Sequence, residues 1–93
     1  MHDWRGIMNE ADLAKRRMVI DQAEGEALFE KLINRIEPDG MVYYKRAEAY
    51  EARDQFERAI ADFRKALALF PMKRWKRQAK EGIYRVEKAL SKK

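Results

Sequence analysis

Between Gly40 and Phe70 the apolar and small residues recur every three or four positions, the spacing that places side chains on one side of an α-helix. The spacing breaks once, at Arg53-Asp54, so the pattern predicts two helices joined by a short turn. Pro71 ends the second helix because proline cannot donate to the helical ladder. The apolar positions are Val42, Tyr43, Ala47 and Tyr50, then Phe56, Ala59, Ile60, Phe63, Ala66, Leu67 and Phe70.

Two aspartates stand where these helices begin. Asp39 and Asp54 each precede a predicted helix, where a carboxylate can accept hydrogen bonds from the free N–H groups of the first turn. Glu57 follows Asp54 by three residues, a spacing typical of a capping box. We therefore expect Asp39 and Asp54 to be the N-caps of the two helices.

A weaker copy of the pattern comes before it. At an offset of 33 residues, Asp21-Gln22 matches Asp54-Gln55. The sequence therefore favours an earlier, degenerate hairpin over residues 9–37, with helices at 9–20 and 21–36. A single continuous helix over the same stretch is the alternative. The residues expected to complete the core from this region are Leu13, Val19, Ile20, Ala27, Leu28, Leu32 and Ile36.

The last segment, residues 72–91, predicts one further helix with a single apolar stripe. Its other faces are Lys, Arg, Gln and Glu, a pattern typical of a helix that caps the end of a stack. The stripe consists of Trp75, Ala79, Gly82, Ile83, Val86 and Leu90.

The first residues of the chain allow two interpretations. Trp4, Ile7 and Met8 are either an extra turn packed on the open end of the stack or a contact for another copy of the chain. We therefore expect a monomer or a weak homo-oligomer, and self-assembly through this patch predicts a mass that depends on concentration.

The composition fits a small helical domain better than an enzyme. The 93 residues hold 21 Lys+Arg against 16 Asp+Glu and no cysteine. The only histidine, His2, and the only serine, Ser91, lie near opposite ends of the chain. The sequence therefore offers no well-placed pair of a nucleophile and a histidine base. The four glycines are isolated, which excludes a phosphate-cradling loop. We expect one domain over residues 1–93 with no catalytic site, no metal and no cofactor.

The distribution of apolar residues predicts where in the cell the protein is located. No apolar run approaches the roughly 18 residues that a membrane span needs. The start of the chain also lacks the apolar stretch of a secretory leader. The expected location is the cytoplasm, with no transmembrane segment.

Residues 40–71 carry large and small side chains in a fixed order. The order is Tyr43-x2-Arg46-Ala47-x2-Tyr50, then Ala59-x3-Phe63, Ala66 and Pro71. This spacing resembles the tetratricopeptide repeat (TPR) family. The resemblance implies an all-α protein of about two TPR-like hairpins, the first degenerate, closed by a capping helix. The departures from the family pattern are Tyr43 for Trp, Arg46 for Leu, Ala47 for Gly, and Arg53-Asp54 where the family often has Gly-Asp.

In that family the first helix of each pair lines a concave groove that takes an extended peptide or a partner helix. The resemblance therefore implies a non-enzymatic interaction module or scaffold whose partner is another protein or peptide. The alternative for Tyr44 is an ordinary exposed aromatic resting over Glu48 and Glu51. Tyr44 and Glu48 also stand where chaperone-binding members carry a carboxylate clamp, so a chaperone tail is a poor candidate. The groove positions carried over by register are Met41, Tyr44, Lys45, Glu48 and Glu51.

A tryptophan within a basic run raises a second possibility, nucleic acid. Residues 71–93 hold a local charge of +7, which leaves −2 in residues 1–70. Cations around an aromatic suit single-strand binding, but Trp75 begins the apolar stripe and is expected to face the preceding hairpin. We therefore favour a solvated basic face over binding of nucleic acid or an anionic membrane surface. The residues of that less favoured phosphate-binding alternative are Lys73, Arg74, Lys76, Arg77 and Lys80.

Overall fold

The computed structural model describes residues 4–35 and 39–92, and in these ranges it contains five α-helices and no strand. The prediction of an all-α fold is confirmed. Ile36 and His2 lie outside the described residues, as do the side chains of Trp4, Ile7 and Met8. The helices are α1 (Trp4–Ile20), α2 (Gln22–Arg35), α3 (Gly40–Ala52), α4 (Phe56–Leu69) and α5 (Lys73–Ser91).

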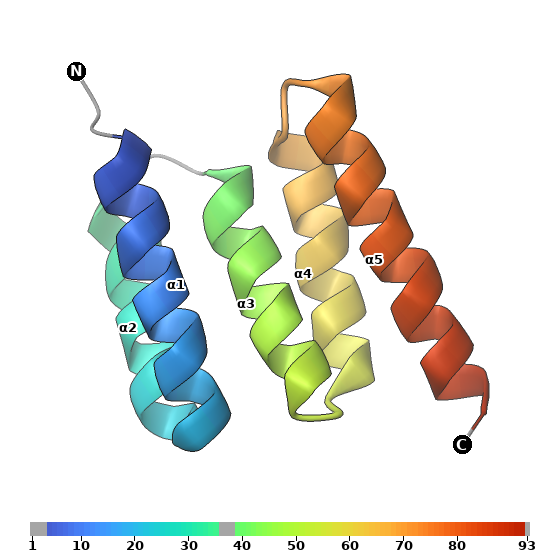
Figure 1. Cartoon of the computed structure of the whole chain (residues 1–93), viewed down its shortest axis with the longest axis horizontal. Helices are drawn as coiled ribbons and strands as arrows, with labels where there is room; N and C mark the ends of the chain where they lie inside the picture. Colours follow the sequence, from blue (N-terminus) through green and yellow to red (C-terminus); the bar gives the residue numbers. More distant parts are fainter. Residues whose placement is uncertain (1–3, 36–38, 93) are drawn as a thin grey trace.

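The helices form two antiparallel hairpins, α1–α2 and α3–α4, followed by α5. Figure 1 shows α1, α3 and α5 in one layer, with α2 and α4 behind them. Helix α3 packs against α1, α2 and α4, and α5 packs against α4. The Cα positions extend over 43 × 32 × 17 Å, so the two layers make a thin slab.

The α1–α2 boundary shows that the first region is a hairpin and not one continuous helix. Helix α1 ends at Ile20, and the Asp21 carboxylate accepts a hydrogen bond from the Glu24 N–H at 3.3 Å. At Gly25 the backbone of α2 comes so close to Met18 of α1 that a Cβ would overlap the Met18 backbone. Glycine is therefore needed for this approach, and it is not merely tolerated within a helix.

The N-cap predictions have different outcomes. Asp39 caps α3 as predicted, because its carboxylate accepts from the Met41 N–H at 2.8 Å. The prediction for Asp54 is wrong: the N-cap of α4 is Gln55, which makes no capping hydrogen bond with its side chain. Asp54 instead has φ 59°, in the left-handed region. An N-cap residue is typically extended, so the residue that reverses the chain cannot also cap the next helix.

The turn between α3 and α4 is fixed onto the first hairpin by Arg53. Its guanidinium donates to the carbonyl of Met18 at 3.3 Å and to that of Val19 at 3.0 Å. These carbonyls belong to the last turn of α1 and have no partner further along that helix. A cation at a helix C-terminus also complements the negative end of the helix dipole. Arg53 is therefore a C-terminal cap supplied by the next repeat.

The core face predicted for α1 is wrong. Leu13, Val19 and Ile20 are 59%, 43% and 76% exposed. Small residues face the neighbouring helices instead, because α1 approaches α2 and α3 closely. Among the other predicted contributors, Leu32 is buried, Leu28 is half-buried and Ala27 is exposed. Among residues 10–20, the part of α1 whose side chains the structure describes, the buried residues are Ala11, Ala14 and Met18.

The predicted faces of α3, α4 and α5 are largely confirmed. Every predicted apolar position of α3 is buried, and those of α4 are buried or half-buried. In α5, Ala79, Gly82 and Val86 are buried, whereas Leu90 is exposed. A Cβ at Gly82 would lie 2.7 Å from Cε1 of Phe63, so glycine allows α5 to rest on this ring. The largest fully buried side chains are Phe29, Phe63, Met18, Val42 and Val86.

Candidate functional site

The candidate site is the side of α3 that lies between α1 and α5. The five groove positions that the resemblance to the TPR family assigns to this helix are called the α3 strip. They are Met41, Tyr44, Lys45, Glu48 and Glu51. Residues three and four apart share a side of a helix, so these positions run along one side of α3. Helices α1 and α5, which belong to the same layer, lie on either side of α3 in Figure 1.

The middle of the α3 strip is joined to α1 by alternating charges. Lys45 Nζ lies 2.9 Å from Asp12 Oδ1 and 3.8 Å from Glu48 Oε1. Lys15 Nζ lies 3.3 Å from the same Glu48 oxygen. The four side chains therefore form a continuous acid–base chain across the α1–α3 boundary, and each of them keeps some contact with solvent.

The end of the α3 strip is joined to α5. The Arg85 guanidinium donates from Nε and Nη2 to the two carboxylate oxygens of Glu51, at 2.6 Å and 2.8 Å. This bidentate geometry is the strong form of an arginine–carboxylate pair. The hydrogen bond with Glu51 raises the pKa of Arg85 above its ordinary value, although partial burial opposes the rise.

The start of the α3 strip is aromatic and mostly covered. Met41 is only 3% exposed, so it offers almost no surface to a partner. Tyr44 is half-buried, with its ring 5.4 Å from Phe63 in an edge-on contact and 6.1 Å from Phe70. Burial raises the pKa of the Tyr44 phenol, and the nearby Glu48 carboxylate raises it further. Tyr44 is therefore part of an aromatic cluster and keeps only part of its side chain open to a partner.

This arrangement suits reversible contact with a charged ligand. Three of the five strip residues, Lys45, Glu48 and Glu51, carry a charge that a neighbouring helix already pairs. Ion pairs that water reaches contribute about 0–1 kcal/mol each. A ligand can therefore replace an internal partner at small cost in stability, provided that it supplies a matching charge.

Sequence reasoning missed a further charged pair, which joins α3 to α4 behind the strip. Arg46 donates from Nε and Nη2 to the Asp62 carboxylate at 2.7 Å and 2.9 Å. Asp62 is only 5% exposed. The hydrogen bond with Asp62 raises the pKa of Arg46, whose guanidinium also lies 5.4 Å from the Tyr43 ring centroid. The sequence signal for this pair was Arg46, which stands at a position where the TPR family usually has leucine.

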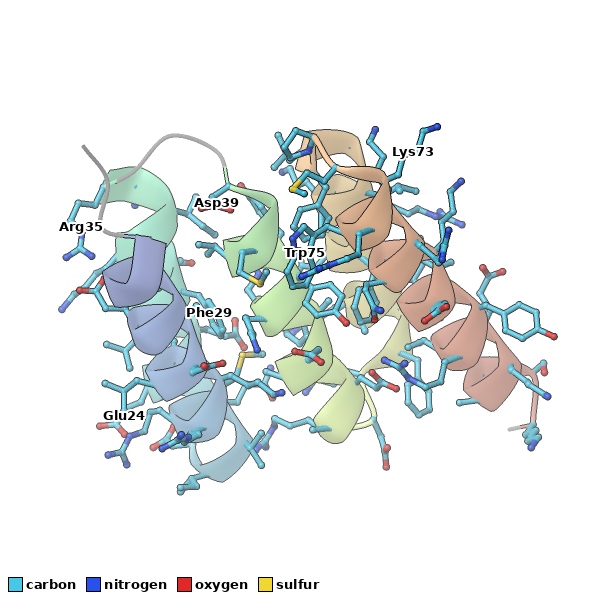
Figure 2. All side chains as sticks on the ribbon, turned by 45° about the horizontal axis from the view of Figure 1, so that its top comes forward. Glu24, Phe29, Arg35, Asp39, Lys73 and Trp75 are labelled. Atoms are coloured by element: carbon cyan, nitrogen blue, oxygen red, sulfur yellow. The ribbon has the colours of Figure 1, made fainter. Side chains whose placement is uncertain are left out.

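The residues of the phosphate-binding alternative all lie in the first half of α5. Four of them are exposed and Lys76 is half-buried. Trp75 faces the hairpin as predicted, since its ring stacks on Phe70 with centroids 5.8 Å apart. Figure 2 shows Trp75 turned in toward α3 and Lys73 pointing away from the bundle. The structure thus brings Trp75 to the core and leaves the cations outside.

The described residues contain no group of three or more His, Cys, Asp and Glu side chains that could hold a metal ion. Within the same ranges, no helix has both the length and the apolar character needed to cross a membrane.

In a comparison with protein-family models, residues 40–72 match the model of the tetratricopeptide repeat. The matched segment covers α3 and α4 and ends just before α5. The resemblance carried by Tyr43, Ala59 and Pro71 is therefore confirmed for the second hairpin. Searches against curated proteins and against solved structures gave no significant match.

Proposed function

We propose that this chain, in which residues 40–72 are a tetratricopeptide repeat, is a protein-interaction module that binds an extended peptide or a helix along the α3 strip. The repeat family generally serves interaction and not catalysis, and the proposed role here is binding without chemistry. The observation that carries the proposal is the layer formed by α1, α3 and α5. It places the first helix of each hairpin and the capping helix side by side.

The charges along this layer favour a ligand of mixed sign. Asp12, Lys15, Lys45 and Glu48 alternate across the α1–α3 boundary, and Glu51 with Arg85 continues the alternation toward α5. A peptide with alternating Lys and Glu side chains can exchange with these pairs one at a time. A uniformly charged peptide would leave half of the groups without partners.

The test uses a ligand selected for this chain and a steric block on the strip. Displayed peptides are selected against the immobilised protein, and the dissociation constants of the recovered sequences are measured by fluorescence anisotropy. Ala52 is exposed and lies one turn beyond Glu48 on the same side of α3. We expect Ala52→Arg to weaken binding at least about tenfold, because a long side chain covers the path of the peptide.

A matched control lies on the other hairpin helix. Ala61 is also an exposed alanine, within α4, and Ala61→Arg adds the same charge and bulk away from the strip. We expect this variant to bind as the wild type does. Equal loss in both variants, or amide shifts on ligand binding confined to α2 and α4, would show that the α3 strip is not the site.

A further inference from the structure

The outer side of α5 carries a second candidate surface, separate from the α3 strip. Its members recur at intervals of three or four residues, opposite the buried side formed by Ala79, Gly82 and Val86. We call this surface the α5 stripe. It consists of Lys73, Arg77, Lys80, Tyr84 and Lys88, and all five residues are exposed.

Tyr84 is the feature that the sequence pattern did not single out. It is 70% exposed, whereas Trp75 of the same helix is half-buried against Phe70. The Lys88 ammonium lies 6.0 Å from the centroid of the Tyr84 ring, which places a cation beside an accessible aromatic face. An aromatic side chain exposed to this extent leaves much of its apolar surface in water, so a planar partner would gain by covering it.

The cations of the α5 stripe have no counter-ion among the residues that the structure describes. Within residues 4–35 and 39–92, no ion pair involves Lys73, Arg77, Lys80 or Lys88, whereas Arg85 on the adjoining side is paired with Glu51. The first turn of α5 contains no acidic residue, and its N-cap, Met72, makes no capping hydrogen bond with its side chain. Cations near a helix N-terminus repel the positive end of the helix dipole. Of the stripe cations, Lys73 lies in this first turn, and an external anion there would relieve the repulsion.

We propose that the α5 stripe binds single-stranded nucleic acid, with phosphates against Lys73, Arg77, Lys80 and Lys88 and a base stacked on Tyr84. A basic track that contains an accessible aromatic is the arrangement that binds single strands without sequence preference. The rise of an α-helix gives this stripe a length of about 22 Å. A duplex is a poorer fit because its bases are already stacked on each other and unavailable to Tyr84.

A membrane surface fits less well than a single strand. Helices that lie in a membrane interface bury a continuous apolar face in the lipid. The apolar face of α5 is already packed on α4, and Tyr84 is the one large apolar side chain among the residues of the stripe.

The experiment measures anisotropy of a fluorescein-labelled oligouridine RNA at low salt, with the chain as wild type, Tyr84→Ala and Tyr84→Phe. Because stacking on an aromatic contributes much of the affinity for each base, Tyr84→Ala should weaken binding about tenfold. Tyr84→Phe keeps the ring and should bind within about twofold of the wild type. Far-ultraviolet circular dichroism checks that the variants remain helical, as the exposure of Tyr84 leads us to expect.

A charge-reversal pair with a matched control tests the phosphate contacts. Arg77→Glu/Lys80→Glu alters the α5 stripe, and Lys31→Glu/Arg64→Glu makes the same change in net charge at exposed positions of α2 and α4. The logarithm of affinity falls with the logarithm of salt concentration by about 0.7 for each phosphate contacted by a single strand. Loss of two contacts should therefore make this slope shallower by about 1.4 in the stripe variant alone.

The proposal would be overturned if the wild type did not bind the RNA at low salt or if Tyr84→Ala bound it as tightly as the wild type. It would also be overturned if the control pair lost as much affinity as the stripe pair. Competition with polyglutamate and with anionic lipid vesicles completes the test. If either displaces the RNA and itself binds Tyr84→Ala as well as the wild type, the surface serves an acidic protein or a membrane instead. The Ala52→Arg variant, which blocks the end of the α3 strip and leaves the α5 stripe unchanged, should bind RNA normally, so the two proposals fail independently.

Discussion

Gln22 and Gln55 hydrogen-bond to each other across the two hairpins. Gln22 Nε2 donates to Gln55 Oε1 at 3.0 Å, and Gln55 Nε2 donates to Gln22 Oε1 at 2.5 Å. Arg53 also donates to Gln22 Oε1, at 3.1 Å. The two glutamines occupy equivalent positions, 33 residues apart, at the turns between paired helices. A repeated residue therefore contacts its own counterpart and fixes the register of one hairpin on the next.

The Gln22–Gln55 contact predicts a measurable coupling energy. We expect Gln22→Ala and Gln55→Ala each to lower the free energy of unfolding by about 1 kcal/mol, because each leaves a half-buried amide without its partner. The double variant should lose about 0.5–1 kcal/mol less than the sum, since each single change already removes the two bonds between the amides. Urea denaturation measures all three. Strictly additive losses would mean that the two amides do not depend on each other.

The Arg46–Asp62 pair predicts an asymmetric effect of substitution. Asp62→Ala should lower the free energy of unfolding by about 2–3 kcal/mol, because it leaves the largely buried Arg46 guanidinium unpaired. Arg46→Leu combined with Asp62→Ala should recover most of that loss, since an apolar side chain needs no partner there. Urea denaturation supplies the comparison. Arg17→Ala, at an exposed pair with Glu24, is the control and should change stability by less than about 0.5 kcal/mol.

The backbone at Asp54 predicts a preference for glycine. A left-handed conformation costs a residue with a Cβ about 1–2 kcal/mol, and aspartate is among the residues that tolerate it best. We expect Asp54→Gly to be at least as stable as the wild type and about 1 kcal/mol more stable than Asp54→Ala. Thermal unfolding of the wild type and the two variants measures their order of stability. Ala61→Gly within α4 should show the opposite preference, and an Asp54→Gly variant less stable than Asp54→Ala would contradict the assignment of φ.

Two tyrosines predict a loss of stability at alkaline pH. Burial raises the pKa of Tyr44 and of Tyr50 above the ordinary value of 10.0, and nearby carboxylates, Glu48 and Glu26, add to the rise. The unfolded chain therefore releases these protons at lower pH than the folded chain does. Their contribution to stability is complete below pH 10.0 and is lost as the pH rises through the folded-state pKa values.

Urea denaturation over this alkaline range tests the prediction, with phenolate absorbance followed in parallel. Tyr44→Phe removes one of the two groups, so its stability should fall less steeply above pH 10.0 than that of the wild type. Identical slopes for the two proteins would show that Tyr44 does not contribute. The Phe side chain keeps the contacts with Phe63 and Phe70, which separates ionisation from packing.

Features that depend on neighbouring residues in the sequence were predicted, whereas features that depend on packing between separate helices were not. The helices at 40–71 and the inward turn of Trp75 follow from periodicity, which is a local property. The core face of α1 does not, because a close approach to α2 selects Ala11 and Ala14 over the larger Leu13 and Ile20. Periodicity weighted by side-chain size therefore selected the wrong side of that helix.

The candidate site shows the same division. Register placed Lys45, Glu48 and Glu51 on one side of α3, but their partners come from residues about 33 or 34 positions away. Only packing of the helices brings Lys15 and Arg85 to them. The pairing of Arg46 with Asp62 likewise needs the angle between α3 and α4. Offsets near the repeat length, as between Gln22 and Gln55, are a sequence signal that carried tertiary information of this kind.

The order of helix contacts has a consequence for how the chain folds. Among the described residues, the main helix packings all join helices one or two places apart along the chain. Few contacts therefore require the closure of a long loop, and a topology of this kind folds rapidly for its size. The α3–α4 hairpin touches both sides of the stack and so can act as the nucleus on which the rest assembles. Helix α5, held mainly through α4, can then detach while the remaining helices stay folded.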